Sequence, residues 1–446
     1  MSNLFSDLMN LAFLFLLRVF LPLLILTAIG YLAWRFFAPQ EAIVRRMSFS
    51  RFMLRLREHP EFRVPELSAK AYFILPIIVL IWIAGAGVLI ARFFWGLGAV
   101  TALNDAVPWG LWIGFDVMAG VALAAGGFSL AATVYVFRLE RYRPILRPAI
   151  LTALLGYTLV IIGLVIDLGR WYNIFHVLWM WNPHSVMFEV AWCVILYTTV
   201  LALEFSPAVF ERFHVMWAQR LLHKIIVPLV ILGCVLSTLH QSSLGSLYLI
   251  FSLKLSPVWW TPTLPVLFFV SALAVGLAMV MIEAALTAGA LKRRLENDLL
   301  ASLAKPVIIL LAIYLAIKLG DPLLRGTFAT LLTLNLATAF FWIEIVLGIL
   351  IPIAIFSTKK GRENPSLRFR AALFVIIGVL LNRMDIAVFG FYDYTAALGT
   401  IYFPSLGEWV VTLAIVTAGI AVYVAAVKFL PILPDESPAK AHALVE

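Results

Sequence analysis

The sequence predicts an all-α protein, a polytopic bundle of about ten or eleven transmembrane helices, from its composition and from its long apolar stretches. Of the 446 residues, 63% are hydrophobic and only 13% are charged, whereas soluble domains carry roughly twice that charged fraction. Apolar stretches recur along the chain, and a bilayer core of about 30 Å requires a helix of about 20 residues. No internal segment has the composition of a soluble domain, so we expect one membrane domain.

Eleven stretches are predicted to span the membrane. The first lacks the basic start of a cleaved signal peptide and is too long for one, so it is expected to be retained. The eighth is short and contains Pro306, and the tenth is interrupted by Asn382, Arg383 and Asp385. In chain order the stretches are residues 11–34, 72–94, 109–136, 149–167, 186–204, 225–241, 264–286, 303–319, 334–356, 370–387 and 408–430.

The distribution of basic residues predicts the orientation in the cell (inner) membrane, because Lys and Arg concentrate in cytoplasmic loops. With the N-terminus outside and the C-terminus cytoplasmic, the cytoplasmic segments hold 26 of the 33 Lys and Arg residues. The net charge of +9 therefore reflects topology and gives no indication of nucleic acid. These segments are residues 35–71, 138–148, 205–224, 287–305, 357–370 and the tail from 428.

Three parts of the chain are predicted. Residues 1–71 add an N-terminal span and a basic amphipathic stretch that is expected to lie on the lipid of the cytoplasmic leaflet. Residues 72–434 form the main membrane domain, and residues 435–446 form a cytoplasmic tail.

The predicted outer loops are rich in Trp, Tyr, Phe and Pro and poor in charge. Aromatic belts at the membrane interface explain much of this composition. The longest loop also suits a surface that another protein covers, because irregular apolar segments need cover. These loops are residues 181–185, 256–265 and 388–409.

Ionisable residues inside the predicted spans are candidates for function, because placing a charge in lipid is expensive. Asp116, Glu189 and Glu344 have no Lys or Arg three or four residues away. Their charged forms therefore have no local support, and we predict that they exchange protons.

Other ionisable residues have structural interpretations. Asp167 and Arg170 are three residues apart at the end of a span, where they can neutralise each other. Glu204 and Glu283 lie near the cytoplasmic ends of their spans, where solvation at the interface is the preferred interpretation.

The chain has few residues that could bind an electron-carrying cofactor. Its only cysteines, Cys193 and Cys234, lie inside predicted spans and cannot build an iron–sulfur cluster. No histidine lies deep within a predicted span, so neither haem nor a metal site is expected. Pairing among the outer histidines is the alternative by which a haem would be held; these are His176, His184 and His240.

Seven ordered motifs carry a resemblance to the NrfD/PsrC family, with an order and spacing similar to its HybB branch. They are PWGLWIGFD (108–116), VYVFRLERYRPILRPAILTALLGY (134–157), IDLGRWYN (166–173), NPHSVMFE (182–189), ALEFSPAVFER (202–212), TLHQSSLGSL (238–247) and FWIE (341–344). The leading residues 1–71 depart from the family pattern.

The resemblance implies a haem-free membrane subunit of a respiratory oxidoreductase. Such a subunit binds menaquinone or another quinone near the outer face. A ferredoxin-like iron–sulfur subunit docked there exchanges electrons with it, and catalytic subunits, of a hydrogenase or another reductase, lie beyond. Sulfur- or sulfite-linked and multihaem cytochrome complexes are alternatives within the family.

The resemblance and the polar pattern together give the candidate site. Glu189, Asp116 and His240 are the expected catalytic residues. The expected quinone-binding residues are Asp167, Arg170, Asn173, His184, Ser185, Gln241, Ser242 and Ser243. Protons are expected either from the cytoplasm by way of the carboxyls of Glu204, Glu283 and Glu344 or from the outer face past Asp167 and His240.

Two interpretations from other classes stand beside this one. A secondary transporter would use the same carboxylates as coupling sites and would have paired, broken helices in two matching halves. A pure membrane anchor would tolerate replacement of all these carboxylates without loss of turnover.

Overall fold

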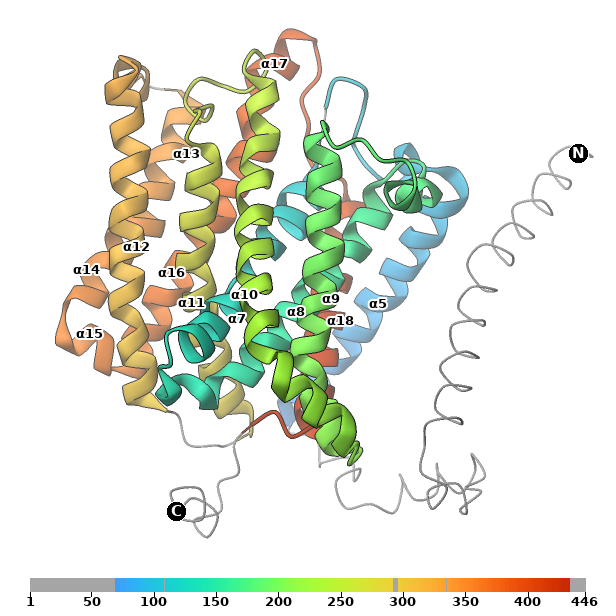
Figure 1. Ribbon diagram of the computed structural model, residues 1–446. Coiled ribbons are helices and arrows are strands. Elements are labelled where there is room, and N and C mark those ends of the chain that lie inside the picture. Colours follow the sequence, from blue (N-terminus) through green and yellow to red (C-terminus); the bar gives the residue numbers. More distant parts are fainter. Residues whose placement is uncertain (1–68, 108, 292–295, 334, 434–446) are drawn as a thin grey trace, which may run out of the picture. The chain divides into compact units, whose positions relative to one another are not determined.

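The computed structural model describes residues 69–107, 109–291, 296–333 and 335–433, and the chain divides into compact units of residues 1–67 and 68–446. The described residues are helical and contain no strand (Figure 1), which confirms the all-α class. The predicted span 11–34, the basic stretch and the tail 435–446 lie outside the described residues.

Ten helical segments of the described chain are long and apolar enough to cross a membrane, and they match the predicted spans from 72–94 onward. The two stretches with the weakest patterns are both helices, since α12 covers Asn297–Leu324 and α16 covers Pro365–Ala387. The start of α16 is fixed by Asn364, whose side chain accepts hydrogen bonds from the backbone N–H groups of Ser366 and Leu367.

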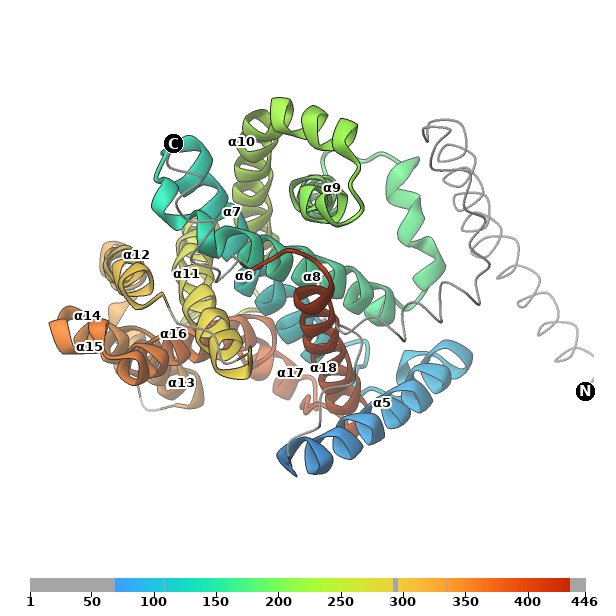
Figure 2. The same ribbon diagram turned by 90° about the horizontal axis from the view of Figure 1, so that it is seen from below.

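Eight of these ten segments, the second to the ninth, form two four-helix bundles. The bundles pack against each other through α10 and α11 (Figures 1 and 2). The first bundle consists of the segment Trp112–Val136, which includes α6 (Gly120–Leu123) and α7 (Gly126–Ala131), with α8 (Arg143–Asp167), α9 (Val186–Arg212) and α10 (Met216–Leu247). The second bundle consists of α11 (Leu264–Leu291), α12, α13 (Leu336–Glu344) with its continuation α14 (Ile351–Ser357), and α16.

The two remaining spans pair with each other. α5 (Ala69–Trp95) packs along α18 (Leu406–Phe429), and α18 in turn packs on α8 of the first bundle. Figure 2 shows this pair beside the two bundles. The pair matters for function because it closes one side of the first bundle.

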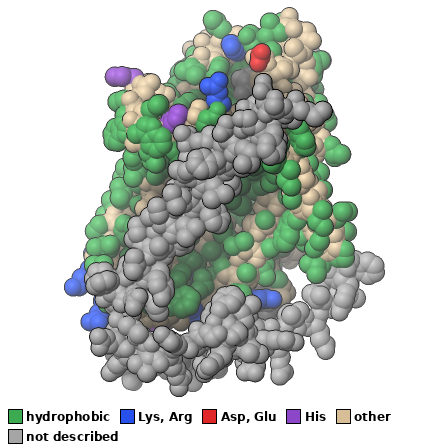
Figure 3. All heavy atoms as spheres, turned by 90° about the vertical axis from the view of Figure 1, so that its right-hand side faces the viewer, with side chains coloured by type: hydrophobic (Ala, Val, Ile, Leu, Met, Phe, Trp, Pro, Cys, Tyr) green, Lys and Arg blue, Asp and Glu red, His purple; other side chains and the backbone are tan. Residues whose placement is uncertain are grey.

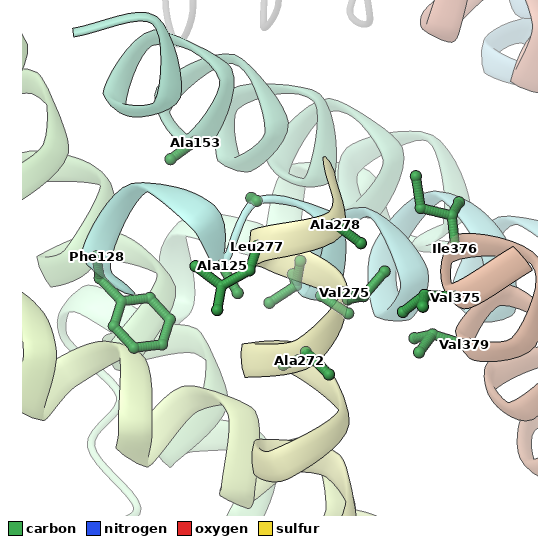
Figure 4. Packing of buried hydrophobic residues seen from close by; sticks show 14 of the residues in the cluster. Ala125, Phe128, Ala153, Ala272, Val275, Leu277, Ala278, Val375, Ile376 and Val379 are labelled. Atoms are coloured by element: carbon green, nitrogen blue, oxygen red, sulfur yellow. The ribbon is translucent and has the colours of Figure 1, made fainter. Parts of the chain in front are cut away.

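Small residues allow the two bundles to approach closely. Ala125, which precedes α7, and Ala272 and Ala278 of α11 lie in the core shown in Figure 4. A methyl group added to Gly276 would overlap the backbone of Gly126, so both positions require glycine. Close backbone approach is the usual basis of helix association in membranes, and it explains the small-residue run at 119–127.

The outer surface of the helices is apolar, as a bilayer requires. On the face seen in Figure 3 the described side chains are mostly hydrophobic, and the basic, acidic and histidine side chains gather toward the two ends. Along α5 large apolar side chains such as Ile77, Leu80 and Ile83 are more than half exposed. This is the pattern of a protein whose solvent around the middle of the helices is lipid.

Candidate functional site

A polar cluster in the first bundle is built around the motif at residues 240–243 on α10. The side-chain amide of Gln241 donates to the carbonyl of Val121 at 3.1 Å, which ties α10 to the opposite helix. Ser243 donates to the carboxylate of Glu189 on α9 at 2.5 Å. Four consecutive helical residues point in different directions, so this motif contacts two neighbouring helices at once.

His240 lies at the interior of this cluster. Its side chain is fully buried, its Nδ1 is 2.9 Å from the hydroxyl of Tyr157 on α8, and the ring of Tyr157 packs edge-on against Tyr197 of α9. Its Nε2 has no hydrogen-bond partner among the described residues. Because an unpaired buried polar atom costs free energy, this nitrogen is a place where water or a ligand atom would be stabilised.

Further unpaired polar atoms extend from His240 along the inside of the first bundle. They come from α9 and α10. Buried polar atoms normally have hydrogen-bond partners, so these atoms are unusual in a hydrophobic core. Among the described residues they include the hydroxyls of Ser237 and Tyr197, the side-chain oxygen of Gln241 and Oε2 of Glu204.

Glu189 is exposed on the surface of the chain rather than buried. It lies in the first turn of α9, which Ser185 caps by accepting a hydrogen bond from the backbone N–H of Phe188 at 3.4 Å. The N-terminus of a helix is a favourable place for an acidic side chain, and a search for basic neighbours overlooks this interaction. Glu189 is thus exposed while its hydrogen-bond partner Ser243 is buried.

Arg170 does not form the pairs considered from the sequence. It is exposed, and no ion pair within the described part of the chain joins it to Asp167 or Glu189. Among the described residues Arg92 of α5 is the cation that lies within electrostatic range of Asp167. It is buried, its Nε donates to the carbonyl of Ile166 at 2.5 Å, and it also donates to the carbonyl of Leu168. Arg92 thereby binds the end of α8 beside Asp167.

Asp116 belongs to a second cluster, on the side of α18. It lies in the π-helical stretch Trp112–Ala119, a distortion that often marks functional positions. Its Oδ2 accepts a hydrogen bond of 2.7 Å from Thr412 of α18, and Gly163 of α8 leaves room for it. Sequence reasoning missed Thr412 because 296 residues separate it from Asp116.

A buried carboxylate next to this cluster was also missed. Glu408 is fully buried and accepts hydrogen bonds from the backbone N–H groups of Ala102 and Ser405, at 3.0 and 2.8 Å, and from the hydroxyl of Tyr402. Its position three residues after Ser405 is a capping-box signal at the start of α18, which identifies it as structural.

Glu344 has a partner that its local sequence does not reveal. It lies in the second bundle, where Lys318 of α12 donates to its Oε2 at 2.5 Å and Tyr314 donates to its Oε1 at 2.9 Å. Both ends of this ion pair are almost completely buried. The expectation of an unpaired carboxylate on the route to Glu189 is therefore wrong for Glu344.

The interpretation of Glu204 and Glu283 as solvated interfacial groups is also wrong. Both are buried. Glu283 accepts hydrogen bonds from Thr152 of α8 and Tyr423 of α18, at 2.7 and 2.8 Å. Glu204 packs against Gly233 of α10, on the inside of the first bundle.

The remaining predicted site residues lie before the N-terminus of α9 or on α10. His184 is exposed, Ser185 is the cap of α9, and Asn173 lies in the short helical segment Trp171–Leu178. Ser242 donates back to the carbonyl of Thr238 on its own helix. The structure thus gathers Glu189, Ser185, His240, Gln241 and Ser243 into one region.

The fold and site define a class, namely polytopic helical membrane proteins whose two four-helix bundles each enclose polar side chains. The described residues contain no group of His, Cys, Asp and Glu suited to a metal ion. Residues 99–392 match the family described as Polysulphide reductase, NrfD. The chain belongs to this family, which confirms the resemblance seen in its motifs.

Individual relatives come from several redox complexes. The chain is 34% identical to the Probable Ni/Fe-hydrogenase 2 b-type cytochrome subunit of Escherichia coli (strain K12), over 78% of this chain and 88% of that protein. It is 29% identical to the Menaquinone reductase, integral membrane subunit of Nitratidesulfovibrio vulgaris, over 77% and 87%. It is 23% identical to the Hdr-like menaquinol oxidoreductase integral membrane subunit of Archaeoglobus fulgidus, over 76% and 88%.

Proposed function

We propose that this protein is the membrane subunit of a respiratory oxidoreductase complex of the hydrogenase-2 type, and that it binds menaquinone or a related quinone at the Glu189–His240 cluster. The observation that carries the proposal is the hydrogen bond between Glu189 and Ser243 beside buried His240. Relatives named as a hydrogenase subunit and a menaquinone reductase subunit support it.

The geometry suits a ligand that arrives through the membrane. Glu189 is exposed at the outer end of α9, whereas His240 is buried behind it, with its Nε2 free of partners within the described chain. A quinone head group entering between them would meet a carboxylate, a hydroxyl and an imidazole, which are groups that bind carbonyl oxygens and hold protons. Reduction of the quinone takes up two electrons and two protons, and this chain supplies the proton-holding groups.

The first bundle also offers a route for those protons. Glu204, Tyr197, Ser237 and Tyr157 follow one another between the far end of α9 and His240, and three of them have polar atoms unpaired within the described residues. We infer that protons reach Glu189 along this column. Glu344 takes no part, because its hydrogen bonds lie in the second bundle. Asp116 and Asp167 border the quinone region from the α18 side.

The described residues do not fit a b-type haem, although the printed name of one relative contains that term. A b-type haem in a membrane bundle is normally held by two histidines that face each other across helices. Among the described residues His240 is the only buried histidine, whereas His176 is half-buried in a short loop helix and His184 is exposed, so no second histidine faces His240 inside the bundle. Electrons must then come from another subunit, and we propose an iron–sulfur protein docked on the loops at 95–108, 170–185 and 242–263.

The purified complex is expected to contain quinone and no haem bound to this chain. Solvent extraction followed by chromatography measures the quinone, and a pyridine-haemochrome spectrum measures haem. A haem signal that disappears in the His240→Ala or His184→Ala variant would contradict the proposal. Loss of quinone in His240→Ala, with every subunit present in its normal amount, is the result that supports the site.

A further inference from the structure

The second bundle encloses a network of charged side chains that the proposed quinone chemistry does not use. Glu344 of α13 is its centre. Besides the bonds from Lys318 and Tyr314 it accepts a hydrogen bond of 3.2 Å from the side-chain amide of Asn382 on α16. The ammonium of Lys318 lies 5.0 Å from the ring centroid of Phe341 and 5.1 Å from that of Trp259, contacts that attract a cation.

Arg383 anchors the network as a fixed cation. It is completely buried and donates to the side-chain oxygen of Asn382 at 2.6 Å and to the hydroxyl of Ser271 on α11 at 2.9 Å. Its guanidinium lies 3.8 Å from the ring centroid of Phe268. These contacts hold it in place against α11.

Asp385 is the unusual member. Its side chain is completely buried, and neither carboxyl oxygen has a hydrogen-bond partner among the described residues. It lies within electrostatic range of Glu344 and Lys318. A carboxylate with no partner is very costly in such a place, whereas a carboxyl group that carries a proton is not. Two carboxyls therefore compete for one mobile cation, Lys318.

A pocket connects this network with one end of the bundle. Lys318 and Asn382 form part of its wall, and Thr261 of the loop 248–263 lies at the loop-bearing end. Asp321 and Arg325, joined by an ion pair of 2.6 Å, also line it. The pocket is polar at these points and has room for water.

We propose that Asp385 and Glu344 form a proton-exchange site that communicates through this pocket with the aqueous phase on the side of the loop 248–263. Asp385 lies three residues after Asn382 and next to Ile386, and both of these line the pocket. The site goes beyond the proposed quinone function, and no quinone is needed for it to work.

Each exchange moves one proton between the carboxyl group of Asp385 and water. The proton leaves the carboxyl of Asp385 for water in the pocket, and the ammonium of Lys318 swings on its flexible stem toward the new carboxylate. Glu344 keeps Tyr314 and Asn382 as donors in that state. Uptake of a proton from the pocket reverses both movements.

A further buried carboxyl on α11, that of Glu283, accepts its hydrogen bonds from Thr152 on α8 and Tyr423 on α18. It is bonded to other helices rather than to this network, so we expect the site to exchange protons with the side of the loop 248–263.

Accessibility of the pocket is tested in sealed vesicles of known orientation that contain the assembled complex. Cys193 and Cys234 are replaced by alanine, and a single cysteine is introduced as Leu267→Cys, on the pocket wall. Val270→Cys, buried nearby on α11 but off the pocket wall, is the matched control. A charged, membrane-impermeant methanethiosulfonate should modify the first cysteine at least tenfold faster, and only from the side of the loop 248–263. Equal rates, or modification from the opposite side alone, would overturn the proposal.

Proton exchange itself is tested with dicyclohexylcarbodiimide, which modifies protonated carboxyls in apolar surroundings. Mass spectrometry of peptides should show modification of Asp385 that slows at least tenfold as the pH is raised on the side of the loop 248–263. The Asp385→Asn variant, which lacks the target, is the control. An unmodified Asp385, or a rate that follows only the pH of the opposite side, would overturn the proposal. Neither readout depends on quinone turnover, so failure here is distinct from failure of the proposed function.

Discussion

Quinone-linked turnover of the assembled complex is expected to fall at least tenfold when Glu189 is replaced by glutamine. Glutamine keeps the size of the side chain and can still accept the hydrogen bond from Ser243, but it cannot hold a transferable proton. A tenfold loss corresponds to about 1.4 kcal/mol in the activation barrier. The measurement is the rate of quinone reduction or quinol oxidation with a soluble quinone analogue.

The same preparation provides the control. Electron transfer from the partner subunits to an artificial acceptor should persist in Glu189→Gln, because that path does not need the carboxylate. Glu211→Gln, which alters an exposed glutamate on the same helix away from the cluster, should retain full activity. Full quinone turnover in an intact Glu189→Gln complex would rule out the role of this residue in proton transfer.

Loss of the buried ammonium group of Lys318 in the second bundle is expected to have the largest effect on stability. Lys318→Met leaves the carboxylate of Glu344 without its ion-pair partner at a position that is 1% exposed. Removing one member of a buried pair costs about 3–5 kcal/mol. The melting temperature in detergent, or the yield of assembled complex, should drop markedly.

A second substitution should restore much of the loss. In the Lys318→Met/Glu344→Gln double variant no charge is left unpaired at this position, and Tyr314 and Asn382 can still bond the amide. The double variant is therefore expected to be more stable than Lys318→Met. If the single variant were as stable as the double, the ion pair would have no structural role.

The sequence was sufficient for the secondary structure and the region of the site. Apolar length predicted each described span, including α16 despite Arg383 and Asp385 within it, because a helix satisfies its own backbone in lipid whatever its side chains do. Motif order led to Glu189, His240 and Ser243, which the structure places in one cluster.

Partners supplied by other helices could not be predicted. Glu344 and Lys318 are 26 residues apart, and Asp116 and Thr412 are 296 apart. A search at helical spacing finds only neighbours on one helix, so it leaves Glu344 unpaired and favours Arg170 over Arg92. Burial of Glu204 and Glu283 likewise depends on which face of a helix meets its neighbours, and helices that are hydrophobic all round give no such signal.

The central claim is that quinone binds in the first bundle beside α9 and α10, and photoaffinity labelling tests it most directly. An azido-menaquinone analogue is cross-linked to the intact complex, and the labelled peptides are identified by mass spectrometry. Labels are expected within residues 185–197 and 236–247, and they should be reduced by excess menaquinone and weaker in His240→Ala. Labels confined to the second bundle, on α12 or α16, would contradict it.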